Sequence, residues 1–210
     1  ILIFSFLVIL SKYFFLIKES KNTWLIFFVI LCCNLIIWFK AEGLVYTTIL
    51  ILSLNFSYQI SNKIKFYINL SYFFIIIFKV FIYQYFDFIL NGQPFYSLDY
   101  ISNLNFEIIL YKLKVILSFL FYYAIHNIFF ISGFLILLVL NFKKKIDNYT
   151  RLLNYYFILN IIFILLVYGL RDLEIEYFVR STLERIIFAS SGFYVLLTIN
   201  IFKNYKNFLK

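Results

Sequence analysis

Charged side chains near residue 180 form the stretch of this sequence best suited to chemistry. Arg180, Glu184 and Arg185 surround the start of a long apolar run, where the N-terminus of a predicted helix favours anions. A guanidinium group can hold two phosphate oxygens at once, so this stretch fits the phosphate of a lipid head group. The alternative is an interfacial collar of salt bridges.

A second group of charges, Lys40 and Glu42, separates two further apolar runs. A short loop does not need many charges of both signs merely to stay hydrated. We therefore expect charges from several loops to converge on the outer face of a helix bundle. The predicted set is Lys40, Glu42, Arg171, Asp172, Glu174, Glu176, Arg180, Glu184 and Arg185.

Other reactive residue types stand inside apolar runs. His126 has two interpretations, a hydrogen bond to a neighbouring helix or a place on a proton or substrate path. Lys12 and Lys79 lie near enough to the ends of their runs to reach the membrane surface. The adjacent Cys32 and Cys33 are expected to behave as small hydrophobes. Because zinc-ligand spacing and glycine-rich phosphate loops are absent from the sequence, it predicts no metal site and no cofactor.

The composition predicts the kind of element that positions these residues. Of the 210 residues, 64% are apolar, 24% aromatic and only 14% charged, whereas soluble domains contain about 25% charged residues. The formal net charge is +9, but the basic residues stand in short clusters between apolar runs, as anchors on an anionic membrane surface do. We therefore expect an integral membrane protein whose partners include membrane lipid and no nucleic acid.

Charge-poor runs of about 20 residues recur along the chain, and this length crosses an apolar layer about 30 Å thick as a helix. The runs do not alternate apolar and polar residues, which excludes the strands of a membrane barrel. We expect an all-α fold, a polytopic transmembrane helix bundle of about seven spans that forms a single domain over residues 1–210. The predicted spans are Ile1–Ile17, Thr23–Phe39, Leu44–Ile60, Phe66–Tyr85, Val115–Phe142, Leu152–Leu170 and Leu183–Phe202.

Clusters of lysine and arginine in alternate loops predict the orientation, because short cytoplasmic loops retain positive charge. This rule places Lys65 and Lys145 in the cytoplasm and Gln93–Asn103 on the opposite side. The segment Tyr83–Lys114 is expected to lie largely at the outer interface, anchored by aromatic residues.

The alternation requires Val115–Phe142 to cross the membrane once. This run is long and carries His126 and Asn127 near its middle, so a broken helix is the alternative. Asn105–Lys114 is then expected to be an interfacial lead-in.

Two short stretches resemble the C-terminal half of bacterial membrane glycosyltransferases of the GT-C superfamily, which includes the dolichyl-phosphate-mannose protein mannosyltransferases. Trp38–Leu44 is similar to a Lys-Asn-Glu-Gly-Leu element between two helices, with Ala41 in place of Asn. Arg180–Phe188 is similar to a Ser/Thr-x-x-Arg stretch that opens a late helix in this group. Ala189 and Ser190 stand where the group often has Gln.

This resemblance implies a glycosyltransferase that moves a sugar from a polyprenyl-phosphate donor to an acceptor on the non-cytoplasmic face of a bacterial inner membrane. It implies that Arg180, Arg185 and Lys40 contact the donor phosphate. Glu42 would orient Lys40 or bind a sugar hydroxyl. The family's catalytic carboxylate lies in an early outer loop that has no counterpart in these residues. We therefore assign no catalytic residue and expect the chain to be the C-terminal fragment of a longer protein.

Two other functions fit parts of the sequence. The absence of Met and the abundance of Phe, Ile and Tyr suit a non-catalytic hydrophobic subunit of a respiratory complex in the mitochondrial inner membrane. Such a proton channel should carry ionisable residues near the middle of several helices. A lipid-linked sugar transporter would share the affinity for lipid phosphate, and discontinuous helices that line a cavity would favour it.

Overall fold

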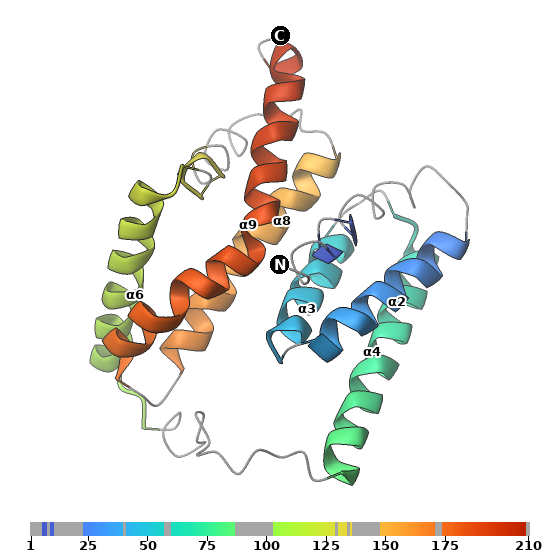
Figure 1. Cartoon of the computed structure of the whole chain (residues 1–210), viewed down its shortest axis with the longest axis horizontal. Coiled ribbons are helices and arrows are strands. Elements are labelled where there is room, and N and C mark those ends of the chain that lie inside the picture. The colour runs from blue at the N-terminus through green and yellow to red at the C-terminus, as the bar shows by residue number, and fades with distance from the viewer. Residues whose placement is uncertain are drawn as a thin grey trace. The chain divides into compact units, whose positions relative to one another are not determined.

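The computed structural model describes the chain in segments, and the regular structure in these segments is helical (Figure 1). No strand occurs among the described residues, which confirms the predicted all-α class. The described residues are 6, 7, 9, 10, 23–39, 41–56, 60–86, 103–128, 130–133, 135, 148–170 and 174–208.

The helices follow the predicted apolar runs, with ends that differ by several residues. The predicted run Thr23–Phe39 coincides with α2, whereas the run predicted to reach Ile60 ends earlier, at Asn55. Most of Ile1–Ile17, with Lys12, lies outside the described residues. The helices are α2 (Thr23–Phe39), α3 (Ala41–Asn55), α4 (Asn62–Tyr85), α6 (Phe106–His126), α8 (Asn148–Gly169) and α9 (Ile175–Phe208).

Three of these helices, α4, α6 and α8, are long and apolar enough to cross a membrane. They indicate a membrane protein. The apolar helices α2 and α3 are shorter, with 17 and 15 residues. With 34 residues, α9 exceeds the length of a single span and carries charges in its first half. The structure thus supports a membrane protein without confirming all of the predicted crossings.

The exposed surface of α4 is dominated by large apolar side chains, among them Phe66, Phe73, Phe74 and Phe78. Of the 18 residues in the most apolar stretch of this helix, only 11% are buried within the structure. Such a face would be costly in water, and it lacks the small residues through which membrane helices approach one another closely. Hydrocarbon chains of a bilayer are its natural surroundings.

The segment predicted to be an interfacial lead-in, Asn105–Lys114, is helical from Phe106 and continuous with the rest of α6. Asn105 caps this helix, because its side-chain oxygen accepts a hydrogen bond from the amide of Ile108 at 2.8 Å. Glu107 stands in the first turn, where the helix dipole favours an acidic residue. The predicted interfacial stretch Tyr83–Lys114 is therefore helical at both ends, and residues 87–102 lie outside the described part.

The helix is also broken inside the predicted run Val115–Phe142, which agrees with the broken-helix alternative, and the single crossing of this run stays a prediction. Helix α6 ends at His126, and Asn127 has an extended backbone with φ −122° and ψ 101°. The Asn127 side-chain oxygen then accepts a hydrogen bond from the amide of Phe130 at 3.1 Å, which begins a new helical turn. Asparagine readily forms such local bonds in place of the helical ladder.

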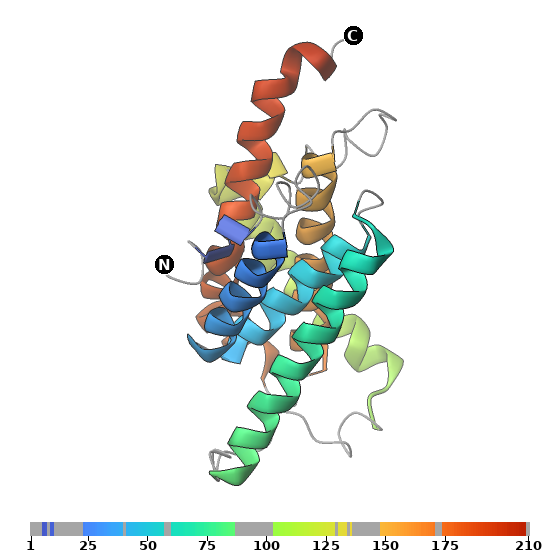
Figure 2. The same cartoon turned by 90° about the vertical axis from the view of Figure 1, so that its right-hand side faces the viewer.

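The chain divides into two compact units, residues 1–91 with 145–156 and residues 92–144 with 157–210. In the first unit, α2, α3 and α4 pack against one another (Figure 2). In the second, α6 packs against α9. The first turns of α8 belong to the first unit, and the rest of that helix belongs to the second.

Hydroxyl groups join α3 to α4 inside the first unit. The phenol oxygen of Tyr72 lies 2.7 Å from Thr47 Oγ1 and 2.9 Å from Thr48 Oγ1. The Tyr72 hydroxyl is also 3.1 Å from the backbone oxygen of Leu44, which accepts its hydrogen bond. Hydrogen bonds of this kind hold membrane helices together where the surrounding lipid offers no partner.

The core of the second unit is aromatic. The ring of Tyr194 lies 5.3 Å from that of Phe130 and 4.9 Å from that of Phe157, both edge to face. Its hydroxyl accepts a hydrogen bond of 2.6 Å from the amide of Asn160 on α8. These contacts tie α8, α9 and the helical turn after Asn127 together.

The helices α6 and α9 run in the same direction. Near their N-terminal ends the Tyr111 hydroxyl donates to the carboxylate of Glu176 at 3.1 Å. Beyond the break in α6, Ser132 and Thr198 share a hydrogen bond of 3.0 Å. The parallel arrangement places the end of α6 beside the first half of α9, where the candidate site lies.

Candidate functional site

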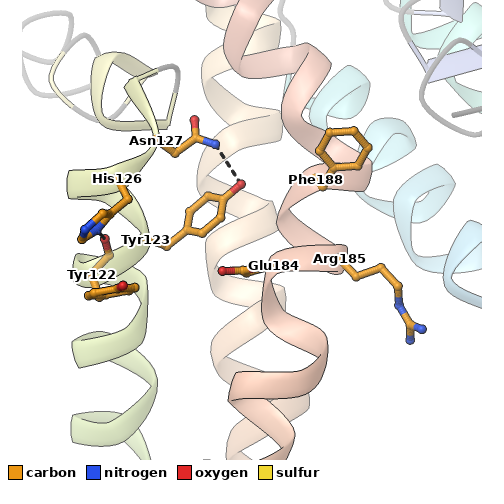
Figure 3. A pocket seen from close by; sticks show the side chains of 7 residues that line it. All are labelled: Tyr122, Tyr123, His126, Asn127, Glu184, Arg185 and Phe188. Carbon is orange, nitrogen blue, oxygen red and sulfur yellow. Dashed lines mark hydrogen bonds between the residues drawn. The ribbon is translucent and has the colours of Figure 1, made fainter.

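A groove of about 400 Å³ lies between the end of α6 and the first half of α9 (Figure 3). Residues four apart on a helix face the same side, and each wall uses this spacing. The end of α6 contributes two such pairs, Tyr122 with His126 and Tyr123 with Asn127. Helix α9 contributes the pair Glu184 and Phe188, together with Arg185. The lining residues are Tyr122, Tyr123, His126, Asn127, Glu184, Arg185 and Phe188.

A hydrogen bond between side chains shapes the floor of the groove. The Asn127 amide nitrogen donates to the phenol oxygen of Tyr123 at 2.9 Å (Figure 3). Asn127 occupies this place because it caps α6, whereas Tyr123 stands one turn earlier. The break in the helix therefore positions both polar groups in the groove.

Within the described part of the chain, His126 forms its hydrogen bond inside α6 and not to a neighbouring helix. Its Nδ1 lies 2.8 Å from the backbone oxygen of Tyr122. The two rings also pack together, with centroids 4.2 Å apart. A protonated Nδ1 would donate to this carbonyl, and the Nε2 atom is then the one available to a ligand.

Glu184 and Arg185 follow each other on α9 and extend in different directions. The Glu184 carboxylate extends towards Tyr123, and Arg185 extends away from the α6 side chains (Figure 3). Successive helix residues are about 100° apart around the axis, which accounts for the divergence. Both side chains are exposed. The carboxylate of Glu184 therefore faces the α6 side of the groove, whereas the guanidinium of Arg185 points away from that side (Figure 3).

The two arginines predicted to act together do not share a face of α9. The guanidinium carbon of Arg180 lies 5.5 Å from the ring centre of Phe119, in a cation–π contact. Arg180 is one turn before Glu184, whereas Arg185 is five residues further on and lies on another side of the helix. Arg185 is among the residues that line the groove, and Arg180 is not.

The other predicted site residues are only partly described. Lys40 lies outside the described residues. Glu42 belongs to α3, but its side chain is not among those described. Both residues are in the first unit, and their predicted roles stay predictions. Of the predicted outer charges, Glu176 bonds to Tyr111, while Arg171 and Asp172 fall outside the described part.

Sequence reasoning missed the tyrosines, Asn127 and Phe188 as members of one site. Two signals were available in the sequence. One was the polar pair His126 and Asn127 within an apolar run, and the other was the four-residue spacing of Glu184 and Phe188, which places both on one side of a helix. These signals did not reveal which helix lies opposite. In the described segments, no three His, Cys, Asp or Glu side chains gather as a metal site would require.

The groove combines aromatic faces with a carboxylate, an amide, an imidazole and a guanidinium. Such a set can stack against a sugar ring, hydrogen-bond its hydroxyls and hold a phosphate. Comparisons with protein-family models, curated proteins and solved structures give no match to this chain. Its function must therefore be argued from the groove itself.

Proposed function

We propose that this chain binds the head of a polyprenyl-phosphate-linked sugar in the groove between α6 and α9, as the donor-binding part of a membrane glycosyltransferase. The observation that carries the proposal is the presence of Glu184 and Arg185 beside the tyrosines in one groove. The membrane we propose is the bacterial inner membrane, and the groove would act on its non-cytoplasmic side.

The division of charge in the groove suits the two parts of such a head group. Arg185, one of the lining residues, matches a phosphate, which its planar guanidinium can hold through two oxygens. Glu184 and Asn127 can accept from and donate to sugar hydroxyls. Tyr122 and Phe188 offer ring faces to the apolar side of the sugar.

The transfer reaction explains why a cation is needed beside the phosphate. The acceptor hydroxyl oxygen bonds to the anomeric carbon while the bond from that carbon to the phosphate oxygen breaks. The hydroxyl proton passes to a carboxylate base, and the polyprenyl phosphate leaves with an additional negative charge. Arg185 would stabilise that charge. The base is not assigned to a residue of this chain.

About seven crossings remain part of the proposal. The parallel course of α6 and α9 supports it, because both helices then cross in the same direction, as the alternation of basic loops requires. The exposed apolar face of α4 also favours a position within the bilayer.

A second candidate function is transport of the same lipid-linked sugar across the membrane. One observation favours it: α6 is interrupted at Asn127, and residues on the break line the groove. Transporters commonly bind their substrates at such discontinuous helices.

Binding and transport can be separated with one preparation. The full chain is reconstituted in nanodiscs, and binding of radiolabelled decaprenyl-phosphate mannose is measured against dioleoylphosphatidylcholine. We expect saturable binding that unlabelled decaprenyl-phosphate mannose displaces and phosphatidylcholine does not. Absence of such binding would overturn the proposed function. Protein-dependent movement of the labelled lipid between the leaflets of vesicles would favour the transporter.

A further inference from the structure

The orientation of the Asn127 amide is determined by the helix that follows it. Its side-chain oxygen accepts from the amide of Phe130 at 3.1 Å, as an N-cap does, and its backbone oxygen accepts from the amide of Ile131 at 3.0 Å. The nitrogen of the side chain must then face Tyr123, at 2.9 Å. Exchange of the amide atoms would place a donor against the Phe130 N–H and lose the cap.

This orientation determines what the Tyr123 hydroxyl can do. A phenol has one hydrogen to donate, and its oxygen here already accepts from Asn127. Its hydrogen therefore has to go elsewhere. The Tyr123 hydroxyl is turned towards Asn127, and the carboxylate of Glu184 lines the same groove beside the tyrosine ring (Figure 3). The groove thus holds both a phenol donor and a carboxylate acceptor.

We infer that Tyr123 and Glu184 together select a hydroxyl group on the bound head, with Asn127 as the residue that positions the Tyr123 donor. This inference rests on the proposed function and names the part of the head group that the groove recognises. A hydroxyl accepts from Tyr123 and donates to Glu184 at the same time. A phosphate oxygen would face the carboxylate, and an ammonium group would meet the phenol donor, so neither matches the pair.

Two lipids, one with the sugar and one without it, test the inference. Decaprenyl-phosphate mannose carries hydroxyls, and decaprenyl phosphate carries only the phosphate. Both are titrated onto the full chain in nanodiscs, and the ratio of their dissociation constants gives the sugar preference. We expect the wild-type chain to prefer the mannosyl lipid by about ten- to a hundred-fold, because a site built for a hydroxyl rejects the analogue that lacks it.

Removal of the donor should reduce this preference. In Tyr123→Phe we expect the preference for mannosyl lipid to fall about ten-fold, with the affinity for decaprenyl phosphate unchanged. Tyr111→Phe removes a phenol hydroxyl from the same helix outside the groove and serves as the matched control. Its preference should equal that of the wild-type chain.

Asn127→Asp is the decisive variant. Aspartate keeps the oxygen that caps the next helical turn, but it replaces the donor to Tyr123 with a second acceptor. The Tyr123 hydrogen would then turn towards residue 127 and away from the groove. We expect the sugar preference to fall as in Tyr123→Phe, although both the phenol and the carboxylate of Glu184 are still present.

The outcomes distinguish the inference from the proposed function. Equal binding of the two lipids by the wild-type chain would overturn the inference alone. An unchanged preference in Tyr123→Phe or in Asn127→Asp would also overturn it. If neither lipid binds, the proposed function fails and the inference fails with it.

Discussion

The ammonium nitrogen of Lys79 on α4 lies 2.6 Å from the backbone oxygen of Ile37, in the last turn of α2. The final carbonyls of a helix lack partners within it, and a cation at that end also interacts favourably with the helix dipole. The rings of Trp38 and Tyr83 lie 5.7 and 5.3 Å from the same nitrogen. Lys79 therefore has a structural role, as its place in an apolar run suggested.

Replacement of Lys79 by Met should destabilise the first unit, because the side-chain stem is kept but the Ile37 carbonyl loses its donor. We expect the free energy of unfolding to fall by about 1–3 kcal/mol, the range for a hydrogen bond to a charged group and for an unpaired buried acceptor. Chemical denaturation in detergent micelles measures this change. Lys63→Met is the control, since Lys63 is exposed on the same helix. Equal stability of the two variants would contradict the role of Lys79.

Gly43 lies where the start of α3 packs closely against the end of α2. A Cβ atom added there would overlap the backbone oxygen of Ile36 and lie 2.9 Å from its carbonyl carbon. Because backbone atoms cannot turn aside, Gly43→Ala must separate the helices, and we expect it to cost about 1–3 kcal/mol or to prevent folding. A Cβ at Gly169 would meet nothing within 4 Å.

Gly169→Ala is therefore the matched control, with stability expected to stay within about 0.5 kcal/mol of the wild-type value. Thermal unfolding of the purified proteins compares the two substitutions. A Gly43→Ala protein as stable as Gly169→Ala would show that the close approach of the two helices does not occur.

The orientation of the chain can be tested with reporter fusions. Fusions after Lys65 and after Lys145 should report a cytoplasmic position, and fusions within Gln93–Asn103 should report the opposite side, because the basic clusters stand in alternate loops. If α6 and α9 both cross the membrane, their parallel packing requires them to cross in the same direction. A cytoplasmic reading within Gln93–Asn103 would refute the orientation or the number of crossings.

Hydrophobic runs predicted the helices well, because burial in lipid and helix formation are both properties of local sequence. The run Thr23–Phe39 matches α2 to the residue. The break at Asn127 was harder to predict, since the sequence allowed both a continuous helix and a broken one. The break is held by two local contacts of Asn127, with Phe130 and with Tyr123. Local sequence does not decide whether such contacts or the continuing helical hydrogen bonds prevail.

The candidate site was predicted less completely than the fold. Arg180 and Arg185 are close in sequence, so they were expected to act as a pair, but five residues along a helix place them on different sides. Arg180 instead contacts Phe119. To predict the groove, one must know that α6 packs against α9, and no local sequence pattern gives that information.

The final prediction separates the two arginines by their effect on lipid binding. Arg185→Ala should weaken binding of decaprenyl phosphate about ten- to a hundred-fold, because a charge-assisted hydrogen bond to phosphate is worth about 1.5–3 kcal/mol. Arg185→Lys keeps the charge but loses the planar fork, so we expect an intermediate loss of affinity.

Arg180→Ala is the control, because it removes the same charge from the same helix but outside the groove lining. Its affinity should stay within about three-fold of the wild-type value, as is typical of an exposed charge. The reverse order, with Arg180→Ala the weaker binder, would place the phosphate beside Phe119 and outside the groove. Wild-type affinity in both alanine variants would show that neither arginine binds the phosphate.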